Sequence, residues 1–146
     1  LGESDFAFDI AKRALDMWKK ETDFSYYTYE CFGIETQRGG WFHNFGGLSA
    51  PICVWANAFC KPGTVTSGFD LWTDKQSATE KTAEISFKYF GGSANYTILV
   101  CLSDQYDYSV LLNGESIVFN ERDKGIIEIT LGGDVKAGEI SIAPRA

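Results

Sequence analysis

The spacing of apolar residues changes once along this chain, near Lys61, and this change limits the folds that the chain can adopt. In two stretches before Lys61, apolar residues recur every three or four positions, which is typical of amphipathic helices. From Thr64 onward they alternate with polar residues, as in strands that bury one face. We therefore expect an α+β fold, with helices in residues 1–62 and an antiparallel β-sandwich in residues 63–146.

Two helices are predicted in the first part, over Ser4–Lys20 and Ser49–Phe59. The second is apolar on nearly every side, which indicates burial on all sides. A hairpin of two such helices cannot cover its own apolar surface. The sandwich, a second copy of the chain or a helical domain outside it must supply the cover, and we favour the helical domain.

The segment between the helices, Asp23–Phe45, is rich in glycine and aromatic residues and has no period of 3.6 or 2. We expect an irregular loop there. Irregular loops of this length are uncommon in compact domains and are usually functional. The segment is therefore the first place to look for a site.

Seven strands are predicted after Lys61, each bounded by turn residues. They cover Thr64–Thr73, Thr82–Phe90, Tyr96–Leu102, Tyr108–Leu112, Glu115–Asn120, Ile126–Leu131 and Glu139–Ile142. Asn113-Gly114 predicts a type I′ hairpin turn. Five aromatic residues of this part are expected to fill the core and an interface: Phe69, Trp72, Phe87, Tyr89 and Phe90.

Charge and composition exclude several classes of function. The net charge of −7 argues against nucleic acid as a partner, because such partners favour a basic surface. The longest apolar run, Leu48–Cys60, is too short to cross a membrane, which takes about 20 residues. The chain lacks a G-x-S-x-G motif, so a serine nucleophile is not expected.

The four cysteines are Cys31, Cys53, Cys60 and Cys101, and their spacing fits no zinc motif. We expect free and mostly buried thiols, with no metal or cofactor. Free thiols and the absence of a recognisable signal peptide favour a reducing compartment, the cytoplasm. The chain opens directly in a helical pattern, as though cut from a longer protein.

Two short runs of residues carry a family resemblance. Glu30–Gln37 reads ECFGIETQ, and Asn44–Ala50 reads NFGGLSA. This arrangement resembles the C-terminal segment of (α/α)₆-barrel glycoside hydrolases of the processing α-glucosidase and mannosylglycerate hydrolase type. Their segment runs Glu-x-Tyr-Asn-Pro-x-Thr-Gly, then a Gly-rich spacer, then Phe-x-Trp-Ser-Ala at the start of the last barrel helix.

The match is close over residues 30–50 and extends to about 60 residues if the flanking helices are included. Five residues agree with the pattern, and they are Glu30, Thr36, Phe45, Ser49 and Ala50. The departures are Phe32 for Tyr, Gly33 for Asn, Ile34 for Pro, Gln37 for Gly and Leu48 for Trp, and the step from Phe45 to Ser49 is one residue longer. Many members of these families also carry a β-sandwich beside the barrel.

The resemblance implies that Glu30 is the catalytic base of an inverting glycosidase acting on a carbohydrate. Such enzymes need a second carboxyl group as general acid, about 6.5–9.5 Å away. We assign no acid within this chain, so the acid would come from an earlier barrel loop. The chain would then be the last helical hairpin of the barrel, inactive alone. A solvated, non-catalytic Glu30 is the alternative.

Four residues near Glu30 are candidates for substrate binding: Tyr27, Trp41, Phe42 and His43. The aromatic rings could stack on a sugar, or they could be packing residues of the barrel. His43 could contact substrate hydroxyl groups, although a structural hydrogen bond is the commoner role for a single histidine.

Two other functions stay open at this point. The sandwich could be a non-catalytic carbohydrate-binding or structural module. Alternatively, the helices could be covered by a second copy of the chain, which makes self-association the main property.

Overall fold

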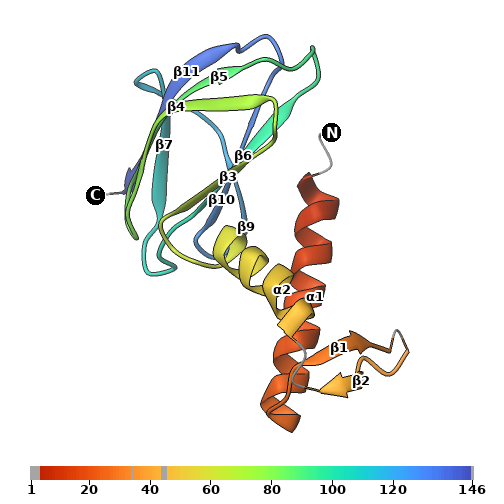
Figure 1. The fold of residues 1–146 in the computed structure, drawn as a ribbon. Coiled ribbons are helices and arrows are strands. Elements are labelled where there is room, and N and C mark those ends of the chain that lie inside the picture. Colours follow the sequence, from red (N-terminus) through yellow and green to blue (C-terminus); the bar gives the residue numbers. More distant parts are fainter. Residues whose placement is uncertain (1–3, 34, 44–45, 146) are drawn as a thin grey trace. The chain divides into compact units, whose positions relative to one another are not determined.

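The structure, a computed structural model, describes residues 4–33, 35–43 and 46–145 and divides into two compact units. The N-terminal unit runs as far as Asn57, and the C-terminal unit begins at Ala58. Helices dominate the first unit and strands form the second (Figure 1). The chain is therefore α+β, and its strands pair in antiparallel fashion.

The N-terminal unit contains two helices and a two-stranded hairpin. Its elements are α1 (Ser4–Ser25), β1 (Tyr29–Phe32), β2 (Gly39–His43) and α2 (Gly46–Phe59). The prediction of an irregular loop is therefore wrong over β1 and β2. These strands have only four and five residues, and a register shift interrupts their pairing, so the sequence shows no period of two.

Helix α1 carries two kinds of apolar surface. Phe8 and Ala11 are buried, whereas Phe6, Ile10 and Phe24 are exposed. Residues 6, 10, 17 and 24 recur at spacings of 4, 7 and 7, which keeps them in one narrow stripe along the helix. We call Phe6, Ile10, Met17 and Phe24 the second stripe of α1.

Helix α2 is also incompletely covered. Ile52 is buried, but Cys53 and Val54 are exposed, with Val54 retaining 63% of its accessible surface. Within this chain the described residues of the helix are thus only partly buried, so the burial predicted on all sides needs cover from outside the chain. An apolar sequence shows which surface favours burial, but the partner that buries it can lie outside the chain.

The C-terminal unit consists of two antiparallel sheets. The first has the strand order β3-β6-β10-β9, and the second has the order β4-β5-β11-β7-β8. The strands are β3 (Thr64–Ser67), β4 (Leu71–Ala78), β5 (Ala83–Tyr89), β6 (Tyr96–Cys101), β7 (Tyr108–Leu112), β8 (Glu115–Ser116), β9 (Asn120–Asp123), β10 (Ile126–Leu131) and β11 (Ala137–Pro144).

The two sheets share one hydrophobic core. On β5, the residues Ile85, Phe87 and Tyr89 point into it, while Lys88 between them is exposed. Residues from β6, β7, β10 and β11 complete the same cluster, and among the largest fully buried side chains are Phe87, Ile98, Ile127, Ile129, Ile140 and Ile142. A single core between two antiparallel sheets makes this unit a β-sandwich.

Two of the predicted strands are each divided in the structure. The segment Thr64–Thr73 turns at Gly68–Asp70, so its halves, β3 and β4, join different sheets. Within Glu115–Asn120 only Glu115–Ser116 pairs with β7, and the next strand, which starts at Asn120, joins the other sheet. Alternation of apolar residues identifies extended chain, but it does not show where the chain passes between sheets.

Both sheets have a β-bulge on an edge strand. In β4, Asp74 is the extra residue between the pairs Thr73–Phe87 and Lys75–Ser86. In β9, Arg122 is the extra residue, and its guanidinium forms an ion pair with the buried carboxylate of Glu128. A buried carboxylate needs such a partner, because desolvation of an unpaired charge is costly.

Three aromatic side chains predicted to be in the core or an interface are solvent-exposed. Phe69, Trp72 and Phe90 are exposed, whereas Phe87 and Tyr89 are buried as predicted. Trp72 lies on the outer face of β4, paired with Lys88, and the backbone N–H of Phe90 donates to the carbonyl of Asp70. The three exposed rings therefore come from one end of the β4–β5 pair.

All four cysteines are free, but only Cys101 is buried, so the prediction of mostly buried thiols is wrong. Burial of Cys101 on β6 raises its thiol pKa to about 11. Less than about one part in a thousand of this thiol is ionised at pH 8, and the thiolate is the reactive form.

We therefore expect Cys31 to react with iodoacetamide at pH 8 well before Cys101, because Cys31 is exposed on β1. A time course of alkylated peptides from the intact chain, measured by mass spectrometry, tests this order. In denaturant the two rates should converge. Equal rates in the folded chain would contradict the burial of Cys101.

In the part of the chain that the structure describes, neither helix is both long and apolar enough to cross a membrane.

Candidate functional site

Three of the predicted site residues, Glu30, Trp41 and Phe42, lie at a β-bulge in the β1–β2 hairpin. The register pairs Tyr29 with His43 and Cys31 with Gly40. One residue, Glu30, lies between these partners on β1, while Trp41 and Phe42 both lie between them on β2. The backbone of Glu30 thus faces two residues instead of one. Bulges redirect side chains and are over-represented next to active sites.

The same hairpin concentrates unusual backbone conformations. Trp41, at the bulge, has a φ of 68°, Gln37 in the turn has 54°, and Tyr26 just before β1 has 61°. The left-handed region costs non-glycine residues about 1–2 kcal/mol each. Such residues persist only where the surrounding structure holds them, and they cluster at functional sites.

The structure describes the side chains of three of the five predicted site residues. Glu30 is exposed, so its carboxylate is open to solvent. Tyr27 and Trp41 are also exposed, with 45% and 77% of their surfaces accessible. The side chains of Phe42 and His43 lie outside the described parts, although both residues belong to β2.

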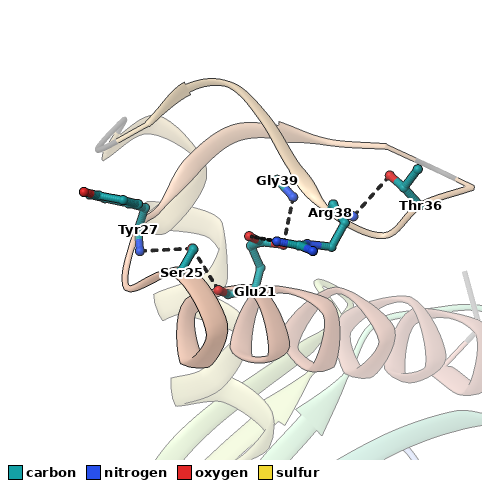
Figure 2. A network of polar contacts seen from close by, with 6 residues as sticks. All are labelled: Glu21, Ser25, Tyr27, Thr36, Arg38 and Gly39. Atoms are coloured by element: carbon teal, nitrogen blue, oxygen red, sulfur yellow. Dashed lines mark hydrogen bonds and ion pairs between the residues drawn. The ribbon is translucent and has the colours of Figure 1, made fainter.

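A buried carboxylate attaches the hairpin to the end of α1. Glu21 is only 2% exposed, and three N–H groups of the hairpin donate to its carboxylate (Figure 2). Arg38 Nε donates to Glu21 Oε2 at 2.6 Å, and Arg38 Nη2 donates to Oε1 at 3.3 Å. The backbone N–H of Gly39 donates to Oε2 at 3.1 Å. This is the forked geometry that arginine forms with carboxylates.

The hydrogen bond from Arg38, aided by the N–H of Gly39, lowers the pKa of Glu21 below its ordinary value of 4.5, against the opposing effect of desolvation. A carboxylate whose pKa is lowered on folding stabilises the folded chain at pH values above its ordinary pKa. That stabilisation is lost as the pH falls through the lowered pKa. The Glu21 carboxylate that attaches the hairpin to α1 is therefore ionised at neutral pH.

Further contacts fix both ends of the hairpin. The guanidinium of Arg38 lies 4.2 Å from the ring centroid of Phe24, a cation–π contact. Ser25 Oγ donates to the Glu21 carbonyl at 2.9 Å and accepts from the Tyr27 N–H at 3.3 Å (Figure 2). The last turn of α1 thus holds the chain both before β1 and at the start of β2.

Tyr29 packs across the hairpin onto glycine. A Cβ placed on Gly39 would collide with the Tyr29 ring, so only glycine fits there. The Tyr29 ring also meets Tyr27 edge to face, with centroids 6.4 Å apart. Glycine at position 39 therefore allows the aromatic residues next to Glu30 to pack closely against the opposite strand.

The chemistry available at the hairpin is that of an exposed carboxylate beside aromatic rings. Such a carboxylate can accept a proton from water, and the rings can stack on an apolar ligand face. Among the described residues, no three His, Cys, Asp or Glu side chains come together in a way that could hold a metal ion.

The sequence analysis missed Glu21, Arg38 and Gly39. The predicted first helix ends at Lys20, which leaves Glu21 outside it, whereas α1 continues to Ser25. Extending the helix would have placed Glu21 three residues after Trp18, within the apolar spacing of that helix. A carboxylate in an apolar helical stripe signals a buried partner, and this signal was available in the sequence.

No protein-family model matches the chain, and no curated protein matches it.

Proposed function

We propose that this chain is the C-terminal portion of an (α/α)₆-barrel glycoside hydrolase and that Glu30 is the general base of an inverting mechanism. The observation that carries the proposal is the bulge, where exposed Glu30 faces Trp41 and Phe42 on a strained hairpin between two helices. Glu30 also opens the motif that resembles these hydrolases, and Trp41 and Phe42 lie in the spacer between its two runs.

In this mechanism Glu30 takes a proton from the attacking water as the water adds to the anomeric carbon. The general acid protonates the leaving oxygen from the opposite face of the sugar, and an earlier loop of the barrel supplies it. Glu30 is exposed, so a water molecule can reach its carboxylate. Tyr27 and Trp41 present exposed rings on which the apolar C–H face of a pyranose can stack.

The exposed apolar surface of the helices supports a larger helical partner. Phe6, Ile10 and Phe24 of the second stripe are exposed, as is Val54 of α2. Full burial of one such side chain contributes about 1.5–3 kcal/mol. In a barrel of helical hairpins each helix packs against neighbours on more than one side, and the preceding hairpins would cover these residues.

The test compares the chain alone with the longer protein that includes the preceding helical hairpins. We expect glycoside hydrolysis only in the longer protein, and its loss when Glu30 is replaced. If the second stripe is instead covered by a second copy, light scattering of the chain alone will show a dimer with no binding of apolar dyes.

A second function, carbohydrate binding by the sandwich, is favoured by the exposed rings of Phe69, Trp72 and Phe90. They lie at one end of the β4–β5 pair, next to the ion pair of Lys88 and Asp74, whose charged atoms are 2.7 Å apart. Aromatic faces beside charged and polar groups suit sugars, which have apolar C–H faces and many hydroxyl groups.

If the sandwich binds glycans, we expect Trp72→Ala to weaken binding at least tenfold, because a central tryptophan contributes about 2 kcal/mol or more to an interface. Calorimetry of the whole chain with a glycan panel measures this. Val118→Ala serves as the control, since Val118 is also an exposed apolar residue and lies outside the β4–β5 pair. Equal loss in both variants, or no binding by the parent chain, would exclude this function.

A further inference from the structure

We propose that Glu21 is a positioning residue, which holds the β1–β2 hairpin so that the Glu30 carboxylate is correctly placed to act as general base. The inference rests on the proposed function of Glu30. It starts from a carboxylate that is almost fully buried in the last turns of α1 and accepts three hydrogen bonds from Arg38 and Gly39 of the hairpin.

The hydrogen bonds of Glu21 lead directly to the bulge. Gly39, which donates its N–H to Glu21, pairs with Phe32 on β1. The next pair along the strands joins Gly40 to Cys31, and the bulge that faces Glu30 follows immediately. Any shift of Gly39 relative to α1 is therefore transmitted through one strand pair to the backbone of Glu30.

The Tyr29 ring provides a second connection between the two residues. It fills the space above Gly39 that a side chain would otherwise occupy. Tyr29 is the residue before Glu30, so movement of Gly39 also displaces the start of the bulge. Gly39 thus contacts β1 in two ways. Its backbone pairs with Phe32, and the Tyr29 ring packs against it where a side chain would otherwise lie.

The hairpin needs an external anchor because two short strands are marginally stable alone. Gln37 and Trp41 in the hairpin and Tyr26 just before it have positive φ, and each adds strain that other contacts must offset. A carboxylate that accepts a forked arginine and a backbone N–H supplies strong and directional contacts. Catalytic groups must be held to within about 0.5 Å of their productive geometry.

The Glu21→Gln substitution keeps the size of the side chain but removes its charge and one of its two acceptor oxygens. In the longer, active protein we expect kcat to fall about 10²-fold with KM little changed, since a misplacement of 1 Å can cost this much. Asp23→Asn is the matched control: it removes a charge from the same helix, but Asp23 is exposed and pairs with Lys19.

Hydrogen exchange gives a readout that does not depend on catalysis. We expect the amides of β1 and β2 to exchange faster in Glu21→Gln, while those of the first turns of α1 and of the sandwich stay unchanged. Arg38→Lys keeps the positive charge but loses the fork, so it should give an intermediate increase in exchange and an intermediate loss of kcat. It also serves as the test if Glu21→Gln does not fold.

The outcomes separate this inference from the proposed function. Unchanged exchange of the hairpin in both variants overturns the role of Glu21, whatever Glu30 does. Faster exchange with unchanged kcat, in a protein that Glu30→Gln inactivates, also overturns it and leaves the function of Glu30 intact. Full activity of Glu30→Gln overturns the proposed function itself, and with it any positioning for catalysis.

Discussion

If Glu30 is the general base that we propose, we expect Glu30→Gln, in a longer protein with the preceding helical hairpins, to lower kcat/KM for glycoside hydrolysis by about 10²–10⁴-fold. This is the usual contribution of a general acid or base. The amide has nearly the shape of the carboxylate but cannot take a proton from water. The hairpin should keep its structure, because Glu30 is exposed and its substitution removes no buried contact. Steady-state kinetics with aryl glycosides measures the loss.

Glu35→Gln is the matched control, since Glu35 lies in the same hairpin, is exposed and is absent from the bulge. We expect it to keep the parent rate. A Glu30→Gln protein with the parent rate, or an equal loss in Glu35→Gln, would refute the assignment.

Replacing Phe87 by alanine destabilises the sandwich by about 3–5 kcal/mol, the range for removing a buried phenylalanine. Phe87 is 1% exposed and lies in the core shared by both sheets. Its ring meets that of Tyr96, from the other sheet, edge to face with centroids 6.2 Å apart. Domains are stable by only about 5–15 kcal/mol, so a large share of the stability is lost.

Chemical denaturation followed by circular dichroism in the strand region measures this change. Phe90→Ala is the control, because Phe90 is the same residue type three positions along and 73% exposed. Exposed substitutions of this kind usually change stability by no more than about 0.5 kcal/mol. If the two variants unfold at the same denaturant concentration, Phe87 does not lie in a core between the sheets.

The sequence predicted the strand-rich half well where one face of a strand is buried. Alternation around Ile85 and Phe87 located β5, and Asn113-Gly114 predicted a hairpin turn that the structure confirms, with φ of 53° and 83° at the two residues. The exposure of Trp72 could not be predicted, because Trp72 lies on a bulged edge strand whose two faces are both largely accessible.

The sequence predicted individual residues of the candidate site but not the β-bulge at which they lie. Glu30 and Trp41 were selected from the sequence, and the structure places them at one bulge. The bulge itself is invisible in the sequence, because an extra residue destroys the alternation by which strands are recognised. The helical pattern indicates that Glu21 has a buried partner, but it does not identify this partner as Arg38, which is 17 positions away.

The bulges on β4 and β9 determine how the sandwich can meet other molecules. Open sheet edges invite strand addition by another chain, and proteins block this with bulges, charges and very short strands. Here β4 carries Asp74 and Lys75 at its bulge, β9 carries Arg122, and β8 has only two residues. Strand addition by another chain at these three edges is thereby disfavoured.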